Sequence, residues 1–157
     1  MIATSSEGSQ NELITLAYGA AAKYGLEGSL ICAIIEQESS WNPWAMRYEP
    51  AFFGRYVEPL VLPWKLSATE AHSRATSWGL MQVMGQVARE ARFAGEFLSM
   101  LCKPDEGMDV GCRVFAAKLA ATEGSLEKAL DLWNGGAAPD YPRQVLGTQE
   151  RYRTAVR

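Results

Sequence analysis

The stretch Ala-Ile-Ile-Glu-Gln-Glu-Ser-Ser-Trp-Asn-Pro, residues 33–43, joins an apolar helical segment to a proline. Ser29, just upstream, is a residue type that favours helix N-caps, and Pro43 cannot continue a helix. We therefore expect a helix over residues 30–39. Its apolar stripe consists of Ile31, Ile34 and Ile35.

Glu38 projects from this apolar stripe, because it follows Ile34 by four residues and Ile35 by three. A carboxyl group among apolar side chains is costly unless it is protonated, paired or used in chemistry. Apolar surroundings and the negative end of the helix dipole both raise its pKa, and a protonated carboxyl is what a general acid requires. The simpler alternative is an ordinary helix-end glutamate in water or in a salt bridge. The helix alone does not choose between these interpretations.

The composition is that of one globular domain, residues 1–157, with 48% hydrophobic and 21% charged residues. The net charge is −3 without a basic run, so we expect no nucleic-acid partner. No apolar stretch reaches transmembrane length, so we expect no membrane insertion. The start of the chain lacks a basic region and carries Glu7 and Glu12, which does not resemble a signal peptide.

The cysteines and the single histidine show no metal-binding spacing. Cys32, Cys102 and Cys112 are odd in number, and we expect free thiols, although Cys102 and Cys112 could pair. His72 is expected at a solvated helix position rather than in a catalytic triad or a zinc site. We therefore expect neither a metal nor another cofactor.

Helical signals dominate the rest of the chain, and no segment reads clearly as a strand, so we expect a mainly α fold. The capping residues and apolar spacings predict helices over residues 9–25, 67–75, 79–92, 97–101, 104–124, 125–134 and 140–155.

Residues 41–66 differ from the rest, because they contain four prolines and little periodicity. We expect an ordered loop with one short helical turn. Eight of the sixteen aromatic residues fall within residues 41–78, including Trp41 and Trp78. These rings either line a cleft, where they can stack on sugar rings, or attach the long loop to the core.

Two further segments combine glycine with polar side chains. Gly79 permits an unusual turn or a close backbone approach, and Gln82 follows it by three residues. Asn134 precedes two glycines, as is usual at a helix C-terminus.

Together these motifs, Glu-Ser-Ser-Trp-Asn-Pro (38–43), Gly-Leu-Met-Gln (79–82) and Ala-Leu-Asp-Leu-Trp-Asn-Gly-Gly (129–136), resemble in order those of the soluble lytic transglycosylase (SLT) domain. This domain belongs to glycoside hydrolase family 23 and is related to goose-type lysozyme. The resemblance covers residues 10–146 and implies a lysozyme-like single domain. In this chain a long aromatic, proline-rich insertion separates the catalytic helix from the Gly-Leu-Met-Gln helix. With Arg47–Pro50, the insertion resembles phage and prophage versions.

The resemblance implies roles for individual residues. Glu38 occupies the position of the catalytic acid, and Trp133 stands where the family usually has Tyr. The substrate-binding candidates are Gln82, Met84, Trp133, Asn134 and Tyr141 from the resemblance, with Trp41 and Trp78 from the aromatic segment. A serine that the family often places between the first two motifs is not assigned.

The resemblance implies cleavage of the β-1,4 bond between N-acetylmuramic acid and N-acetylglucosamine in peptidoglycan, with a 1,6-anhydro product. Glu38 would serve as acid and then as base. A two-carboxylate glycosidase would need a partner, for which Glu49, Glu58 and Glu70 are available, and a hydrolytic muramidase is the alternative enzyme. The other alternative is a non-catalytic wall-binding protein or structural virion component.

The expected partners are peptidoglycan glycan strands, together with phage virion or secretion-machine proteins. Since peptidoglycan lies outside the inner membrane and no signal peptide is seen, delivery is expected in a virion or by a non-classical export route.

Overall fold

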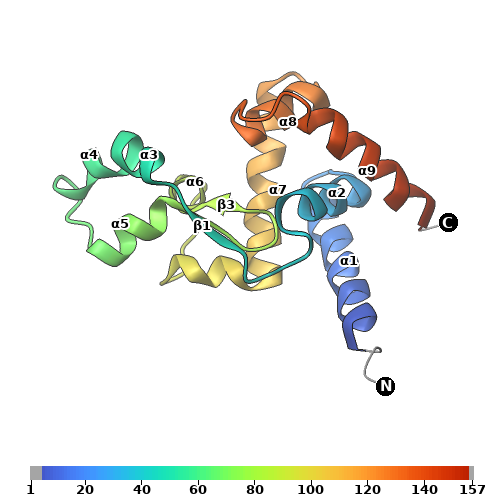
Figure 1. The fold of residues 1–157 in the computed structure, drawn as a ribbon, viewed down its shortest axis with the longest axis horizontal. Helices are drawn as coiled ribbons and strands as arrows, with labels where there is room; N and C mark the ends of the chain where they lie inside the picture. The colour runs from blue at the N-terminus through green and yellow to red at the C-terminus, as the bar shows by residue number, and fades with distance from the viewer. Residues whose placement is uncertain (1–4, 156–157) are drawn as a thin grey trace.

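The computed structural model describes residues 5–155. The long helix α7, Pro104–Ala121, lies between two groups of elements (Figure 1). One group consists of the helices α1 (Ser5–Lys23), α2 (Gly28–Ser39), α8 (Leu126–Asn134) and α9 (Tyr141–Ala155). The other group contains the strands and the short helices α3 to α6. Within the described residues, no helix is both long and apolar enough to span a membrane.

Helix α2 is the central element of the helical group, and all of its residues from Gly28 to Ile35 are buried. The predicted N-cap at Ser29 is wrong, because the helix begins at Gly28 and Glu27 is the capping residue. Gly28 allows a close approach here, since a Cβ atom would lie 2.2 Å from the Tyr18 ring. The helix thus starts one residue before Ser29, at a glycine that packs closely against α1.

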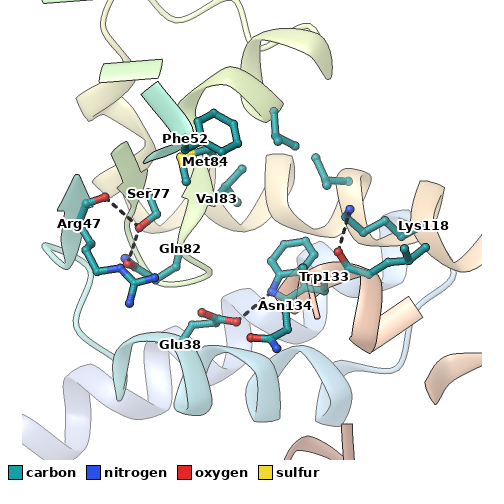
Figure 2. Close-up of a pocket in the computed structure, with 14 residues that line it drawn as sticks. Glu38, Arg47, Phe52, Ser77, Gln82, Val83, Met84, Lys118, Trp133 and Asn134 are labelled. Atoms are coloured by element: carbon teal, nitrogen blue, oxygen red, sulfur yellow. Dashed lines mark hydrogen bonds between the residues drawn. The ribbon is translucent and has the colours of Figure 1, made fainter. Parts of the chain in front are cut away.

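The predicted end of α2 at Ser39 is confirmed. Ser40 adopts a left-handed conformation, with φ 50°, and its N–H donates to the Glu36 carbonyl. The helix thus ends one residue after Glu38, which keeps this side chain on the last turn, facing the strands (Figure 2).

The domain is mainly helical, as expected, but it also contains three short strands that the sequence did not indicate, and they form an antiparallel sheet. They are β1 (Met46–Tyr48), β2 (Thr76–Trp78) and β3 (Val83–Met84), in the order β1-β2-β3. The predicted helix over residues 79–92, and with it the Gly-Leu-Met-Gln helix, is also wrong. These four residues form the turn between β2 and β3, and α6 occupies only Gly85–Glu90.

The turn has two left-handed residues, Gly79 with φ 70° and Gln82 with φ 49°. The Gln82 side-chain amide donates to the carbonyls of Ala45, at 3.0 Å, and Gly79, at 2.9 Å. Glycine accepts this conformation without strain, whereas glutamine requires such compensating contacts. Long-range hydrogen bonding therefore overrides the helical spacing of the residues.

The segment expected as a loop with one helical turn is largely helical beyond β1. Its elements are α3 (Pro50–Phe52), a π-helix (Phe53–Val57) and α4 (Glu58–Val61). The predicted cap at Ser67 is confirmed, since its side chain accepts from the Glu70 N–H at the start of α5 (Ala68–Arg74). A small second core, formed by Val57, Ala71 and Ala75, holds this segment together.

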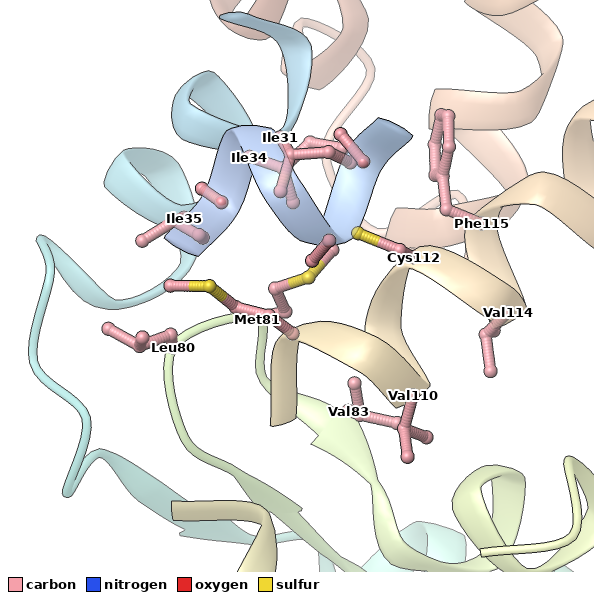
Figure 3. Packing of buried hydrophobic residues seen from close by; sticks show 14 of the residues in the cluster. Ile31, Ile34, Ile35, Leu80, Met81, Val83, Val110, Cys112, Val114 and Phe115 are labelled. Atoms are coloured by element: carbon pink, nitrogen blue, oxygen red, sulfur yellow. The ribbon is translucent and has the colours of Figure 1, made fainter. Parts of the chain in front are cut away.

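The other predicted helices are confirmed apart from their ends. The first begins at Ser5 rather than Ser9, and a 3-10 helix covers Leu98–Cys102. All three cysteines are buried and free, as expected. Figure 3 shows Met81, from the turn, among buried residues of α2 and α7. A Cβ atom on Gly111 of α7 would lie 2.4 Å from the Met81 sulfur, so this glycine lets the turn pack on α7.

Candidate active site

A cavity of about 380 Å³ lies between the strands and the ends of α2 and α8, with α7 forming part of its wall (Figure 2). Of the predicted site residues, the structure brings Glu38, Gln82, Met84, Trp133 and Asn134 together in its lining. Arg47, Phe52, Ser77 and Lys118, which were not among the predicted site residues, also line the cavity. A volume of this size is typical of small-ligand sites.

Glu38 is held by two side chains from distant parts of the sequence. The Trp133 indole N–H, from the end of α8, donates to Oε1 at 3.1 Å. The Tyr141 hydroxyl, from the start of α9, donates to the same oxygen at 2.5 Å. Among residues 5–155, neither a hydrogen bond nor an ion pair involves Oε2. The carboxyl group is thus anchored through one oxygen, and the other oxygen is available to a ligand.

The surroundings of Glu38 favour its protonated form. Burial raises its pKa above the ordinary glutamate value, and this effect outweighs the two hydrogen bonds and the charge of Arg47, which lower the pKa. Burial and the nearby carboxylate also raise the pKa of Tyr141, which therefore remains a neutral hydrogen-bond donor. A raised pKa is the direction of shift that a general acid requires.

Two cations accompany this carboxyl group in the cavity. Arg47 projects from β1 and pairs with Glu49 at 2.6 Å. Lys118 projects from α7, where its ammonium group donates to the Leu132 carbonyl at 3.2 Å, and burial lowers its pKa. Of the described residues that line the cavity, Glu38 is the only carboxylate.

The three candidate partner carboxylates do not line this cavity. Glu70 forms ion pairs with Arg74 at 3.0 Å and Arg89 at 2.8 Å. Burial alone would raise the pKa of Glu70, but these two cations lower it overall, so it is held ionised away from the site. Glu49 is paired with Arg47, and Glu58 lies at the start of α4.

The sheet wall of the cavity is tied together by Ser77 and Gln82. The Ser77 hydroxyl donates to the Gln82 side-chain oxygen at 2.9 Å, and the Gln82 amide nitrogen is used by the turn. Met84 pairs with Ser77 across β2 and β3. The polar atoms of Gln82 therefore hold the wall in place. Ser77 lies beside the Gly-Leu-Met-Gln motif, and this proximity in sequence is the signal that could have identified it.

Asn134 ends α8, and its side chain closes the loop that follows. With the amide oxygen facing the Ala137 and Ala138 N–H groups, it accepts hydrogen bonds at 3.2 and 2.7 Å. Gly135 then takes the left-handed conformation of a helix C-cap, with φ 67°. This local geometry positions Trp133, one residue earlier, with its indole N–H on Glu38.

Trp41 and Trp78 lie outside the cavity lining. Trp78 is 7% exposed within the main core, and its indole N–H donates to the Ser73 carbonyl. Trp41 donates to the Tyr152 hydroxyl on α9 at 2.9 Å. Of the eight aromatic residues in 41–78, only Phe52 is in the lining. The aromatic composition of the segment indicated no particular ring, because stacking on a core and stacking on a ligand need the same side chains.

We predict that Trp41→Phe lowers the free energy of unfolding by about 1 kcal/mol, because the hydrogen bond to Tyr152 is lost while the ring is kept. Glycan affinity should be unchanged, since Trp41 is not in the cavity lining. Chemical denaturation and binding to purified glycan strands measure the two effects. Weaker binding at unchanged stability would place Trp41 in the binding surface.

Among the described residues, no three His, Cys, Asp or Glu side chains gather in a way that could hold a metal ion. The cavity instead offers one anchored carboxyl, two cations and an apolar wall. These groups can bind a ligand with polar or anionic groups and can protonate one of its oxygen atoms.

Comparison with known families agrees with this chemistry. The model of the transglycosylase SLT domain matches residues 15–144, most of the chain. The protein belongs to this family. Its members are peptidoglycan-cleaving lytic transglycosylases, and peptidoglycan is accordingly the substrate of this SLT domain. Neither the curated proteins nor the solved structures include a significant match.

Proposed function

We propose that this SLT domain cleaves the β-1,4 bond between N-acetylmuramic acid and N-acetylglucosamine and forms a 1,6-anhydro product. Glu38 first gives its proton to the departing glycosidic oxygen. The resulting carboxylate then accepts the proton of the muramoyl C6 hydroxyl as that oxygen bonds to C1. One bond breaks and one forms, the proton returns to Glu38, and no water is consumed.

The observation that carries the proposal is the environment of Glu38. Its Oε1 accepts two hydrogen bonds from Trp133 and Tyr141, so the proton is best carried on Oε2. Both donors also stabilise the carboxylate that forms after proton transfer. The same pair therefore fixes the orientation of the group in both halves of the reaction.

The absence of a second carboxylate from the described lining supports a mechanism with one acid. A retaining glycosidase places two carboxyl groups about 5–5.5 Å apart and an inverting one about 6.5–9.5 Å apart. With Glu38 alone, the positive charge that develops at C1 is best stabilised by the acetamido group of the substrate. A hydrolytic outcome, in which water replaces the C6 hydroxyl, is the second candidate, since the same carboxylate can activate either.

The remaining site residues have supporting roles in this proposal. Gln82 and Ser77 fix the sheet wall, and Met84 offers an apolar surface to a sugar ring. Asn134 holds the end of α8, and Trp133 replaces the family's usual tyrosine as a donor to the acid. An indole N–H cannot accept a proton, so this contact remains a donor at every pH.

Mass spectrometry of purified sacculi after digestion tests the proposed reaction. Anhydro-muropeptides are expected, with a mass 18 Da below that of the hydrolysed products, the mass of one water. Reducing-end products would support the hydrolase instead. Intact sacculi under conditions where the protein binds them would contradict both enzymatic candidates and support the wall-binding alternative.

We predict that Tyr141→Phe moves the alkaline limb of the pH–rate profile to higher pH. The tyrosine donates a hydrogen bond that lowers the pKa of Glu38, so its removal raises this pKa further. Because the acid must begin the reaction protonated, activity then persists to higher pH, although the maximal rate falls as orientation is lost. The measurement is kcat/KM against pH for both proteins. A limb that moves to lower pH would contradict the assignment of Glu38 as the acid.

A further inference from the structure

The C-terminal end of α8 is joined to α7 by the side chain of Lys118. The ammonium group of this lysine donates a hydrogen bond to the Leu132 carbonyl at 3.2 Å (Figure 2). The N–H groups of Gly135 and Gly136 both donate to the Asp131 carbonyl instead. Among residues 5–155, the Leu132 carbonyl therefore receives a hydrogen bond from Lys118 alone. A cation is favourable here, because the last carbonyls of a helix lack backbone partners and form the negative end of its dipole.

A second side chain of α7 contacts Trp133, the residue that follows Leu132. The centres of the Phe115 and Trp133 rings lie 5.7 Å apart, and the angle of 64° between their planes makes this an edge-to-face contact. Phe115 is fully buried and precedes Lys118 by three residues, so both side chains extend from one face of α7. Helix α7 thus supports Trp133 at two points, with Phe115 against its ring and Lys118 on the adjacent backbone.

The indole of Trp133 connects this support to the acid. Its N–H donates to Oε1 of Glu38 at 3.1 Å, which lies toward the long end of the usual range for such a bond. A shift at the end of α8 would therefore weaken the contact and release the carboxyl group from one of its two donors. Lys118 is half-buried, and a charge-assisted hydrogen bond that is partly shielded from water is stronger than an exposed one.

We propose that Lys118 is a positioning residue for the reaction, and that its hydrogen bond to the end of α8 holds the Trp133 indole on Glu38. In this role the lysine acts through Trp133 and does not touch the substrate. Lys118 lies outside the three sequence motifs of the family resemblance. The inference rests on the proposed function, because it takes Glu38 as the acid.

Few other charged groups surround the cavity and the groove that adjoins it between α6 and α7. They are Arg47 on β1, Glu90 on α6 and Arg113 on α7, and Tyr141 on α9 donates to Glu38. Burial raises the pKa of Glu38, and of the charged side chains among the described residues only Arg47 lowers it. We therefore expect Lys118 to affect Glu38 through Trp133 rather than through its own charge.

A double-mutant cycle with Trp133 tests this coupling. Lys118→Met removes the ammonium group and keeps a long apolar side chain. We expect kcat on purified peptidoglycan fragments to fall about tenfold, with KM changed less than about twofold. In the Trp133→Phe background the indole donor is already absent, so the same substitution should lower kcat less than about twofold. An equal loss of kcat in both backgrounds, or a loss confined to KM, would overturn the inference.

The pH dependence is a readout that a general loss of packing would not move. Burial raises the pKa of Glu38, and the hydrogen bond from Trp133 lowers it. When this bond weakens in Lys118→Met, the pKa rises further, and the alkaline limb of kcat/KM should move to higher pH. Lys128→Met is the matched control, since Lys128 is an exposed position on α8 that lines neither the cavity nor the groove. An unmoved limb in Lys118→Met, or an equal shift in both variants, would overturn the inference.

A wild-type protein that cleaves no peptidoglycan would refute the proposed function, and the contact is then tested without activity. The indole N–H signal of Trp133 in a heteronuclear NMR spectrum is assigned by its loss in Trp133→Phe. We expect its hydrogen exchange to be about tenfold faster in Lys118→Met and unchanged in Lys128→Met. If Lys118→Met does not fold, the shorter Lys118→Gln replaces it in every measurement. Unchanged exchange in the folded Lys118 variant would overturn the inference.

Discussion

Glu38→Gln is expected to reduce the release of muropeptides from sacculi by about 10³-fold or more, because the only acid in the described cavity lining is removed. The substitution keeps the shape of the side chain. Its amide oxygen can still accept the hydrogen bonds from Trp133 and Tyr141, so the fold and the cavity should persist. Quantified chromatography of released muropeptides measures the rate, and retained binding to sacculi shows an intact cleft.

Glu36→Gln is the matched control for this experiment. Glu36 lies two residues earlier on α2, outside the cavity lining, and pairs with Arg151 at 2.7 Å. This variant should keep near wild-type activity, because the ion pair is exposed on the Arg151 side and such pairs contribute about 0–1 kcal/mol. Near wild-type cleavage by Glu38→Gln, or equal loss in both variants, would remove Glu38 from the proposed role.

A comparison of the stability of Glu38→Gln with that of the wild-type protein gives an independent test. The folded-state pKa of Glu38 is raised, so between the unfolded and folded pKa values the folded protein binds more protons than the unfolded chain. Wild-type stability therefore falls as pH rises through this window, whereas Glu38→Gln lacks this loss. The melting temperature of the variant relative to wild type should increase from acidic to neutral pH. A constant difference would indicate that the Glu38 pKa is not raised.

Gly79→Ala is expected to lower the free energy of unfolding by about 2–5 kcal/mol. Gly79 has φ 70°, a conformation that costs about 1–2 kcal/mol for a residue with a Cβ atom. The new Cβ would also lie 2.4 Å from the Leu101 carbonyl oxygen, and overpacking against backbone costs about 1–3 kcal/mol more. Chemical denaturation measures the change. Activity should fall too, because the turn positions Gln82 and Ser77, which form the sheet side of the cavity.

Gly147→Ala on α9 provides the control, because this glycine has helical backbone and a Cβ atom would meet nothing within 4 Å. Here alanine should stabilise the protein by about 0.5–1 kcal/mol, since it favours the helix more than glycine does. A Gly79→Ala protein as stable as wild type would mean that the turn can relax away from Leu101, and that its conformation is not fixed by this contact.

Local sequence signals predicted the long helices well. Pro104 at the first position of α7 and Gly135 at the end of α8 both act through the few residues beside them. Prediction failed at residues 79–84, where the apolar spacing favours a helix and the chain forms a turn and a strand. The deciding partners are Ala45 and Leu101, which lie outside any local window.

The candidate site, too, could be predicted from the sequence only where neighbouring residues determine it. The position of Glu38 on the apolar face of α2 followed from its spacing to Ile34 and Ile35. Its two hydrogen-bond donors lie 95 and 103 residues further along the chain, and their contact with one oxygen is a product of how α8 and α9 pack on α2. No motif predicted a site role for Arg47 or Lys118, so only the folded chain shows that they share the cavity.

The sequence by itself therefore determined the helical class of the protein, the place of Glu38 on α2 and the membership of the SLT family, since each depends on short-range spacing or ordered motifs. The tertiary structure decided that the Gly-Leu-Met-Gln segment is a turn, that Trp41 and Trp78 lie outside the cavity lining, and that Trp133 and Tyr141 hold Glu38. The physical reason is the range of the interactions. Helix caps and i, i+4 contacts join neighbours, whereas a cavity is made by side chains that only packing brings together.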